Sequence, residues 1–242
     1  MILKRSLMKL AISFLFITTY SANVASNEFP SFEGLVVPAI GIDNLPYKNS
    51  DLQIAPSLIV MGRLGDLFIE GNRAGYLVNR SALGALSVMG QVRTHQYIPQ
   101  ESTFGTRDKS MELGLQLAKP LAYGWTGQVT AFTDVSDTHQ GSELELSVYR
   151  RDYFGENFRL LTMFAAQQQD QKLTSFYADA MNYKADADLN LEFELLGVYE
   201  FNQDWSAVVV YRHYFHGDGI AQSPITDKDE TIKLALGIGY RF

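Results

Sequence analysis

The sequence predicts an all-β protein, an antiparallel transmembrane β-barrel with short turns at one end and longer loops at the other. Three observations lead to this fold class. Large apolar residues alternate with small or polar ones over stretches of about ten residues, as lipid-facing and lumen-facing positions do in a barrel strand. Aromatic residues gather near the ends of these stretches, and the connections alternate between short and long. The composition agrees with strands and turns, since 12% of the residues are aromatic and only 19% are charged.

The first 25 residues predict a secretory signal peptide. An apolar run from 10 to 17 is followed by small and polar residues and is preceded by three basic residues, Lys4, Arg5 and Lys9. Signal peptides share this order of charged, apolar and small-residue regions. The run is too short for a membrane-spanning helix, which needs roughly 20 residues. We expect cleavage after Ala25 or Ser26, which leaves residues 26–242 as one barrel domain.

The composition also excludes several classes of protein. Beyond the signal peptide no run of 18 apolar residues occurs, which excludes a helical membrane protein. The chain has no cysteine, so it can form neither a disulfide framework nor a thiol-linked lipid anchor. Its net charge of −7 argues against a nucleic-acid partner, because phosphate neutralisation needs a basic surface.

Five segments show the alternation of apolar and polar residues most clearly. They are 111–117, 144–148, 189–201, 205–215 and 232–242. In the last segment one face carries six large residues that would contact outer-membrane lipid, namely Ile232, Leu234, Leu236, Ile238, Tyr240 and Phe242. The other face is small or cationic and consists of Lys233, Ala235, Gly237, Gly239 and Arg241. A soluble β-sandwich also alternates, but the long segments, the aromatic residues at their ends and the two kinds of connection favour a barrel.

The connections give the order and number of strands. The short ones are 62–66, 119–122, 154–157 and 202–204, and the longer ones are 43–50, 96–108, 169–188 and 216–230. Short turns belong on the periplasmic side and long loops on the outside. The stretch 64–80 must then contain an even number of crossings, which two short strands at 66–71 and 74–79 would supply. We therefore expect twelve strands, with ten as the alternative if this hairpin does not form.

The sequence predicts no catalytic, metal-binding or cofactor-binding residue. Its four histidines lie in no nucleophile elbow and no metal-binding spacing, and they are His95, His139, His213 and His216. Two acidic pairs, Glu143 with Glu145 and Glu192 with Glu194, each project to one side of a strand, and paired carboxylates can serve acid–base chemistry. Acids in a barrel lumen more often pair with basic residues across it. The sequence therefore indicates a polar cluster in the lumen that consists of Glu192, Glu194, Arg212, Lys233 and Arg241.

The carboxy-terminal segments resemble the MipA/OmpV family of outer-membrane proteins. The resemblance rests on Ser223-Pro224-Ile225 in a loop, a short acidic stretch after it, and the final residues 236–242. Further similar pieces are Pro46-Tyr47, Ser50-Asp51, Ile54-Ala55-Pro56 and the stretch from Phe68 through Gly75-Tyr76. The ending Ile238, Tyr240 and Phe242 also resembles the signal that the barrel assembly machinery reads. The resemblance implies a location in the outer membrane.

The same resemblance implies a role in assembly of the cell envelope. One member of that family is a scaffold that joins a murein-degrading lytic transglycosylase to a bifunctional penicillin-binding protein. A non-enzymatic scaffold or interaction protein is therefore the leading functional hypothesis. A passive channel that favours cations is the second, because twelve strands can leave space in the lumen. A barrel hydrolase that uses Glu143 or Glu192 is the third and weakest.

Overall fold

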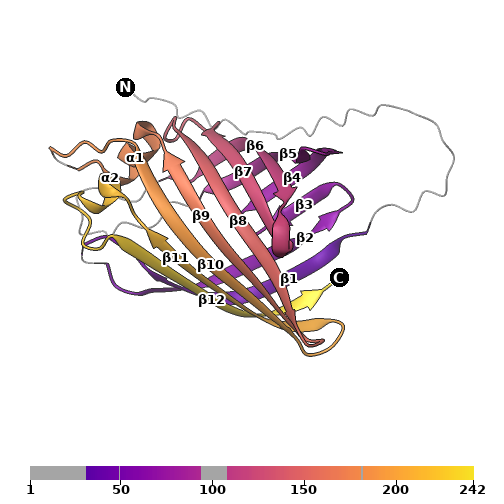
Figure 1. Ribbon diagram of the computed structural model, residues 1–242. Helices are drawn as coiled ribbons and strands as arrows, with labels where there is room; N and C mark the ends of the chain where they lie inside the picture. The colour runs from indigo at the N-terminus through magenta and orange to yellow at the C-terminus, as the bar shows by residue number, and fades with distance from the viewer. Residues whose placement is uncertain (1–30, 49, 94–107, 181) are drawn as a thin grey trace, which may run out of the picture. The chain divides into compact units, whose positions relative to one another are not determined.

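A computed structural model describes residues 31–48, 50–93, 108–180 and 182–242, and Ser31–Phe242 forms one compact unit (Figure 1). The signal peptide predicted for the first 25 residues lies outside the described part of the chain. No helix within the described residues is both long enough and apolar enough to span a membrane.

The described chain forms a closed barrel of twelve strands, in which each strand pairs antiparallel with its sequence neighbours and β1 closes the sheet against β12. The prediction of twelve strands is confirmed, and the 64–80 stretch forms the expected hairpin as β3 and β4. The first six strands are β1 (Glu33–Asn44), β2 (Gln53–Leu64), β3 (Leu67–Glu70), β4 (Arg73–Ser81), β5 (Gly84–Arg93) and β6 (Ser110–Pro120). The other six are β7 (Trp125–Asp134), β8 (Ser142–Phe154), β9 (Phe158–Gln169), β10 (Asp188–Glu200), β11 (Trp205–Phe215) and β12 (Glu230–Arg241).

The two ends of the barrel differ. The short turns after β2, β4, β6, β8 and β10 lie at one end of the barrel, together with Glu33 at the start of β1 and Phe242 just after β12. Two backbone hydrogen bonds between Gly34 and Phe242 join the chain there. We call this the periplasmic end, because barrels place their short turns there. The opposite, outer end carries the helices α1 (Gln171–Ala178) and α2 (Asp218–Ala221) (Figure 1).

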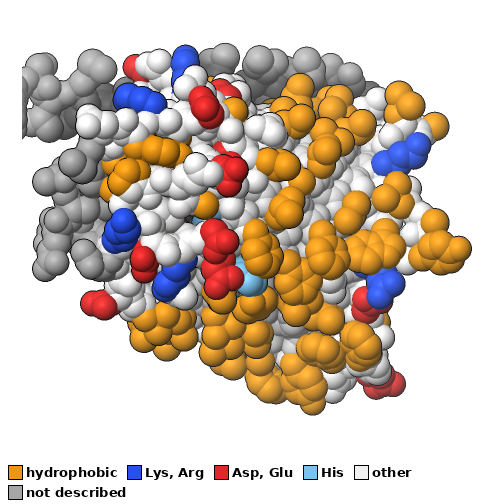
Figure 2. Space-filling view, turned by 60° about the vertical axis from the view of Figure 1, so that its left-hand side comes forward, with side chains coloured by type: hydrophobic (Ala, Val, Ile, Leu, Met, Phe, Trp, Pro, Cys, Tyr) orange, Lys and Arg blue, Asp and Glu red, His pale blue; other side chains and the backbone are white. Residues whose placement is uncertain are grey.

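Strand β8 shows how the sequence pattern becomes a membrane-spanning wall. Its outward residues Leu144 and Leu146 are about half exposed, whereas the inward residues Glu143, Glu145 and Ser147 are buried. Exposed apolar residues recur in the same way on the neighbouring strands, and one face of the barrel shows them as a broad patch with charged side chains mainly at its margins (Figure 2). Such a belt is stable only against lipid, because it would expose far more apolar area than a soluble protein does.

Strand β3 is much shorter than the strands around it. It has four residues and pairs with β2 only from Met61 to Leu64. The twelve-residue strand β2 therefore extends far beyond the β3–β4 hairpin towards the outer end, while its other edge pairs with β1 along 53–63.

Candidate functional site in the barrel lumen

The lumen contains a cavity of about 1560 Å³ that extends from residues near the periplasmic end, such as Arg241, to residues near the outer end, such as Tyr177. Inward-facing side chains line it. They form a charged wall on β4–β11 and an apolar wall on β1, β2 and β10–β12.

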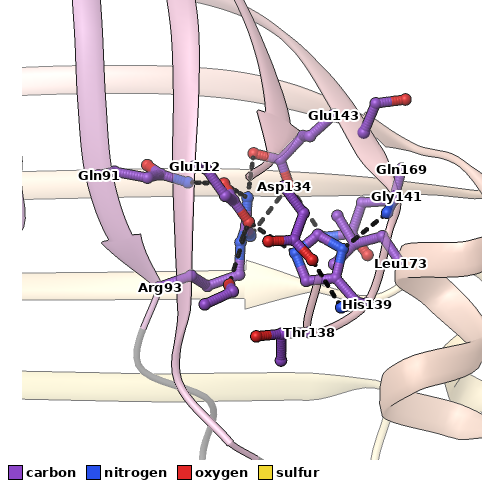
Figure 3. A network of polar contacts seen from close by, with 12 residues as sticks. Gln91, Arg93, Glu112, Asp134, Thr138, His139, Gly141, Glu143, Gln169 and Leu173 are labelled. Atoms are coloured by element: carbon purple, nitrogen blue, oxygen red, sulfur yellow. Dashed lines mark hydrogen bonds and ion pairs between the residues drawn. The ribbon is translucent and has the colours of Figure 1, made fainter. Parts of the chain in front are cut away.

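One part of the charged wall is centred on Glu112 of β6, whose side chain is almost fully buried (Figure 3). Its carboxylate accepts hydrogen bonds from Arg93 at 2.6 Å and from the side-chain amide of Gln91, and it contacts His139 Nε2 at 2.9 Å. Arg93 also reaches Glu143 of β8, with 3.1 Å between Nη2 and Oε1. A single guanidinium thus joins two carboxylates from strands on both sides of β7.

The charged wall continues through Arg73, which follows the turn between β3 and β4. Its guanidinium donates two parallel hydrogen bonds to Glu145 of β8, at 3.0 and 2.8 Å. This fork-to-fork pairing is the strongest geometry for arginine and a carboxylate. Gln167 then donates to both Glu145 at 3.2 Å and Glu192 at 2.8 Å, so the network passes on to β10.

Three residues of the polar cluster predicted from the sequence lie together at this point. Arg212 of β11 forms an ion pair with Glu194 and lies 3.7 Å from Glu192. Lys233 is opposite Arg212 in the strand register and has its amino group 5.9 Å from the centre of the Tyr214 ring. Arg241 is at the other end of the barrel, where it and Arg159 form ion pairs with Glu200. The lumen therefore holds two separate charged groups, and Arg241 belongs to the periplasmic one.

The apolar wall is a cluster of buried side chains that project into the lumen from β1, β10 and β11. Its members are Leu35, Val37, Ala39, Val198, Val208 and Val210. Ile59 and Met61 of β2 pack against it from the side, together with Leu196 and Ala235. This lumen wall is thus as apolar as a small protein core.

The loops at the outer end form a cap over part of the lumen. Asp170 begins α1 by accepting a hydrogen bond from the backbone N–H of Leu173 at 2.9 Å, and Leu173 is fully buried. Ser223 donates to the carbonyl of Ala178 at 2.5 Å, which joins the loop after α2 to the end of α1. Ile225 packs with Leu45, Tyr47 and Ala180. The Ser-Pro-Ile motif noted in the sequence therefore holds three loops together.

His216, which follows β11, is part of the same cap. Its Nε2 lies 2.8 Å from the Thr231 hydroxyl, and its Nδ1 lies 3.3 Å from Asn190 Oδ1. Burial and the nearby positive charge of Lys233 lower the pKa of His216 to about 4 from its ordinary 6.5, although Asp229 acts in the opposite direction. The imidazole is therefore neutral in the closed cap at neutral pH.

The chemistry of the lumen is that of paired charges. Each acidic residue of the charged wall contacts an arginine, and among the described residues no group of three His, Asp or Glu side chains has the arrangement of a metal site. Arg73 and Arg93, the partners of several of these acids, are not among the lumen residues predicted from the sequence. The alternation along 84–93, which places Gln91 and Arg93 on the inward face, is the signal that would have indicated one of them.

The two residues that precede the carboxy-terminal Phe242 in the predicted assembly signal lie on the outward face of β12. Ile238 is 48% exposed and Tyr240 is 38% exposed. Phe242 follows the strand, with its ring centre 5.0 Å from that of Tyr240 and 6.2 Å from that of Phe32. All three are thus accessible from the lipid side or the periplasmic end, and their role in assembly stays a prediction.

Comparison with known proteins gives a consistent result. A family model described as "MltA-interacting protein MipA" matches residues 39–242. The protein named MltA-interacting protein from Escherichia coli (strain K12) is 22% identical over 220 residues, which cover 84% of this chain and 88% of that protein, and the one from Shigella flexneri matches equally. Among solved structures, the COG4313 outer membrane channel from Pseudomonas putida F1 covers 91% of this chain and 100% of its own, with 14% identity and a TM-score of 0.44. OmpT of Vibrio cholerae has 7% identity and a TM-score of 0.40, and covers 91% of this chain and 100% of its own.

Proposed function

The chain belongs to the MltA-interacting protein MipA family, and from this membership we propose that it is a non-enzymatic scaffold for murein-processing enzymes. It is an outer-membrane β-barrel, as the closed sheet, the apolar outer belt and the family all indicate. The relatives' name states an interaction with MltA. We extend that interaction to this chain, with a murein-degrading lytic transglycosylase as the partner and a penicillin-binding protein as a second one.

The periplasmic end is the surface that such an enzyme would meet. It consists of five short turns, so a docking site must combine the tips of several of them. Tyr123 in the β6–β7 turn is 92% exposed and has a left-handed backbone conformation (φ +57°), followed by Gly124 at φ +76°. Leu83 in the β4–β5 turn is 74% exposed. A large aromatic and a large aliphatic side chain on two turns are suitable anchors for a protein partner.

The ion pairs and the cap in the lumen support this proposal. The charged wall is joined across the barrel by ion pairs, and the cap of α1, α2 and their loops buries Leu173 and Ile220 at the outer end. An arrangement of this kind favours a fixed barrel with its function at the surface over an open path for solutes. The acids that would select cations are neutralised by arginines, which weakens the channel hypothesis in its cation-favouring form.

A binding measurement tests the scaffold. The purified barrel in lipid nanodiscs is expected to retain lytic transglycosylase from envelope extracts and to bind the purified enzyme directly. Replacement of both Tyr123→Ala and Leu83→Ser should weaken this binding about tenfold, the effect of two modest hot-spot residues. The matched control is Val135→Ser, because Val135 is an exposed apolar residue in a loop at the outer end. If the unaltered barrel retains no murein hydrolase or synthase, the scaffold role is wrong.

The length of the cavity supports a second candidate, a narrow passive channel. The cavity is lined by residues from both ends of the barrel, so only the cap and side chains interrupt it. Planar-bilayer recording distinguishes the candidates, since a channel gives steps of conductance and a scaffold leaves the bilayer silent. The hydrolase hypothesis has no comparable support, because Glu143 and Glu192 both lie beside arginines. Unchanged envelope activity in Glu143→Gln and Glu192→Gln would remove it.

A further inference from the structure

Within the part of the chain that the structure describes, the barrel wall has a gap beside the outer half of β2. Because β3 ends at Glu70 and pairs with Met61, the β2 residues 53–60 pair with β1 on one edge and, among the residues that the structure describes, with no strand on the other. The next strands across the gap, β4 and β5, are joined at Arg73 and Gln91 beneath it. We call the gap bounded by 54–60 of β2 and the Gly71-Asn72 turn of the hairpin the lateral opening.

The exposure of β2 shows that this opening passes through the wall. On an intact strand only alternate residues are exposed, yet the five consecutive residues from Ile54 to Leu58 are all exposed. The lumen cavity is lined by the inward-facing Ala55 and Ser57 and also by the outward-facing Pro56 and Leu58. Because both faces of β2 are exposed over these five residues, we read the run as the edge of an opening in the wall. Gly71 and Asn72 line it on the opposite side.

The backbone of β2 fits an edge without a neighbouring strand. The carbonyl of Val60 accepts a hydrogen bond from Gly71 N–H at 2.8 Å, which shows that the backbone polar groups of Val60 point towards the hairpin. Backbone groups of alternate residues point to the same side of a strand, so those of Leu58 and Pro56 point into the opening. Pro56 has no N–H to leave unpaired there. Proline within sheets is found at such edges, at the first residue of a strand or at bulges.

The rim of the opening and the space behind it are both apolar. On the outside, Ile54 is 66% exposed and Leu58 is 63% exposed on β2, while Val92 of β5, which donates a backbone hydrogen bond to Asn72 beside the gap, is 42% exposed. In an outer-membrane barrel these side chains meet lipid. Behind the opening, Ile59 and Met61 pack against the apolar wall of the lumen. Large apolar side chains thus lie on both sides of the opening, towards the bilayer and towards the cavity.

We propose that the lateral opening is a binding portal for an acyl chain of a membrane lipid, which enters the lumen between β2 and the β3–β4 hairpin. The chain would lie along the apolar wall, where the cavity-lining Ile59, Met61 and Leu35 offer hydrocarbon contact, and would leave the charged wall on β4–β11 in contact with water. Water from the cavity would also solvate the free backbone groups of β2, which hydrocarbon alone could not satisfy. This ligand site is independent of the scaffold role, since it uses neither the periplasmic turns nor a protein partner.

Single-tryptophan variants reconstituted in vesicles of brominated phospholipid test the portal, because bromine atoms on acyl chains quench only an indole that they contact. Trp125 and Trp205 are first replaced by Phe. Leu58→Trp then faces outward and Ile59→Trp faces inward at the opening. The matched pair is Val129→Trp, outward, and Gln128→Trp, inward and cavity-lining, on the fully paired strand β7.

On the fully paired strand β7, bromine is expected to quench the fluorescence of the outward Val129→Trp several-fold more strongly than that of the inward Gln128→Trp. At the portal the quenching of Ile59→Trp should approach that of Leu58→Trp. If Ile59→Trp is quenched as weakly as Gln128→Trp, no acyl chain enters and the portal is wrong. Folding of each variant is checked by heat-dependent migration in gels, and Ser57→Trp, an exposed inward position, replaces Ile59→Trp if the latter does not fold. Loss of the scaffold interaction would leave this result unchanged.

Discussion

Strands β8 and β2 have similar lengths and a similar alternation of side chains, but their surroundings differ. β8 pairs along its length with β7 and β9, and its inward residues Glu143 and Glu145 are buried. β2 pairs fully only with β1, and its inward residues Ala55 and Ser57 are exposed. The burial of a barrel strand is therefore decided by the length of its neighbours as much as by its own sequence.

The contact between Arg73 and Glu145 links these two regions. The β3–β4 hairpin has a short ladder on its β2 side, and Arg73 at its tip reaches across the lumen to β8. We infer that this ion pair compensates for the hydrogen bonds that a longer β3 would supply. Strands β6–β9, which are paired on both edges and which we call the complete wall, thus stabilise the β3–β4 hairpin beside the lateral opening, which we call the incomplete region.

Removal of this link should have the largest effect on stability. Arg73→Met leaves the Glu145 carboxylate, whose side chain is 3% exposed, without its arginine. Breaking one partner of a buried ion pair costs about 3–5 kcal/mol. Urea unfolding of the barrel in lipid vesicles measures the loss, and hydrogen exchange should show the amides of β3 and β4 opening before those of β8.

Two variants control this measurement. Arg150→Met breaks an ion pair with Asp152 whose side chains are 40% and 29% exposed, and it should cost at most about 1 kcal/mol. The double variant Arg73→Met/Glu145→Met removes both charges and should recover most of the stability. Equal losses for Arg73→Met and Arg150→Met would show that the link across the lumen is not a support of the hairpin.

The complete wall could be predicted from the sequence to a large extent. The segment 205–215 coincides with β11, and the final alternating segment from Ile232 corresponds to β12 within two residues. The apolar face of these strands must meet lipid, so the period of two is strong and local. The hairpin of β3 and β4 was also predicted, because an even number of crossings was needed there.

The lumen contacts and the lateral opening could not be predicted in the same way. Glu194 and Arg212 lie on adjacent strands and face each other by register, so their proximity follows from the pattern. Arg73 and Glu145 are 72 residues apart and meet only because the strands tilt and close into a barrel. The opening depends on where β3 ends relative to β2, and no residue type fixes that length.

Proline substitutions should destabilise strands β8 and β2 to different extents. The N–H of Leu146 lies in a ladder on the complete wall, since β8 is paired on both edges, and Leu146→Pro should cost about 3 kcal/mol or more. Leu58→Pro should cost less than about 1 kcal/mol, because the N–H of Leu58 points into the opening. Urea unfolding in lipid vesicles measures both. Comparable losses at the two positions would mean that the outer edge of β2 is paired after all.

The smallest effect concerns pH and the cap formed by α1, α2 and their loops. Above about pH 6.5 His216 is neutral whether the loop 216–229 is closed or open, so the closed state keeps its full stability. As the pH falls towards about 4 the open loop binds a proton and the closed loop does not, which favours opening by about 1.4 kcal/mol per pH unit. At pH 5 the closed cap should have lost about 2 kcal/mol, and below pH 4 the loss should stop.

Hydrogen exchange of the 216–229 amides between pH 7 and pH 4, corrected for the intrinsic exchange rate, measures this opening. His216→Gln has no titrating group at this position, so its loop stability should stay flat over the same range. The amides of β3 and β4 serve as an internal reference, because His216 contacts Asn190 and Thr231 on the complete side of the barrel and no contact of its ring with the hairpin is present among the described residues. If the hairpin amides lose protection together with the loop in acid, the cap and the lateral opening move as one unit, and the division of the barrel into a rigid and an incomplete region does not hold.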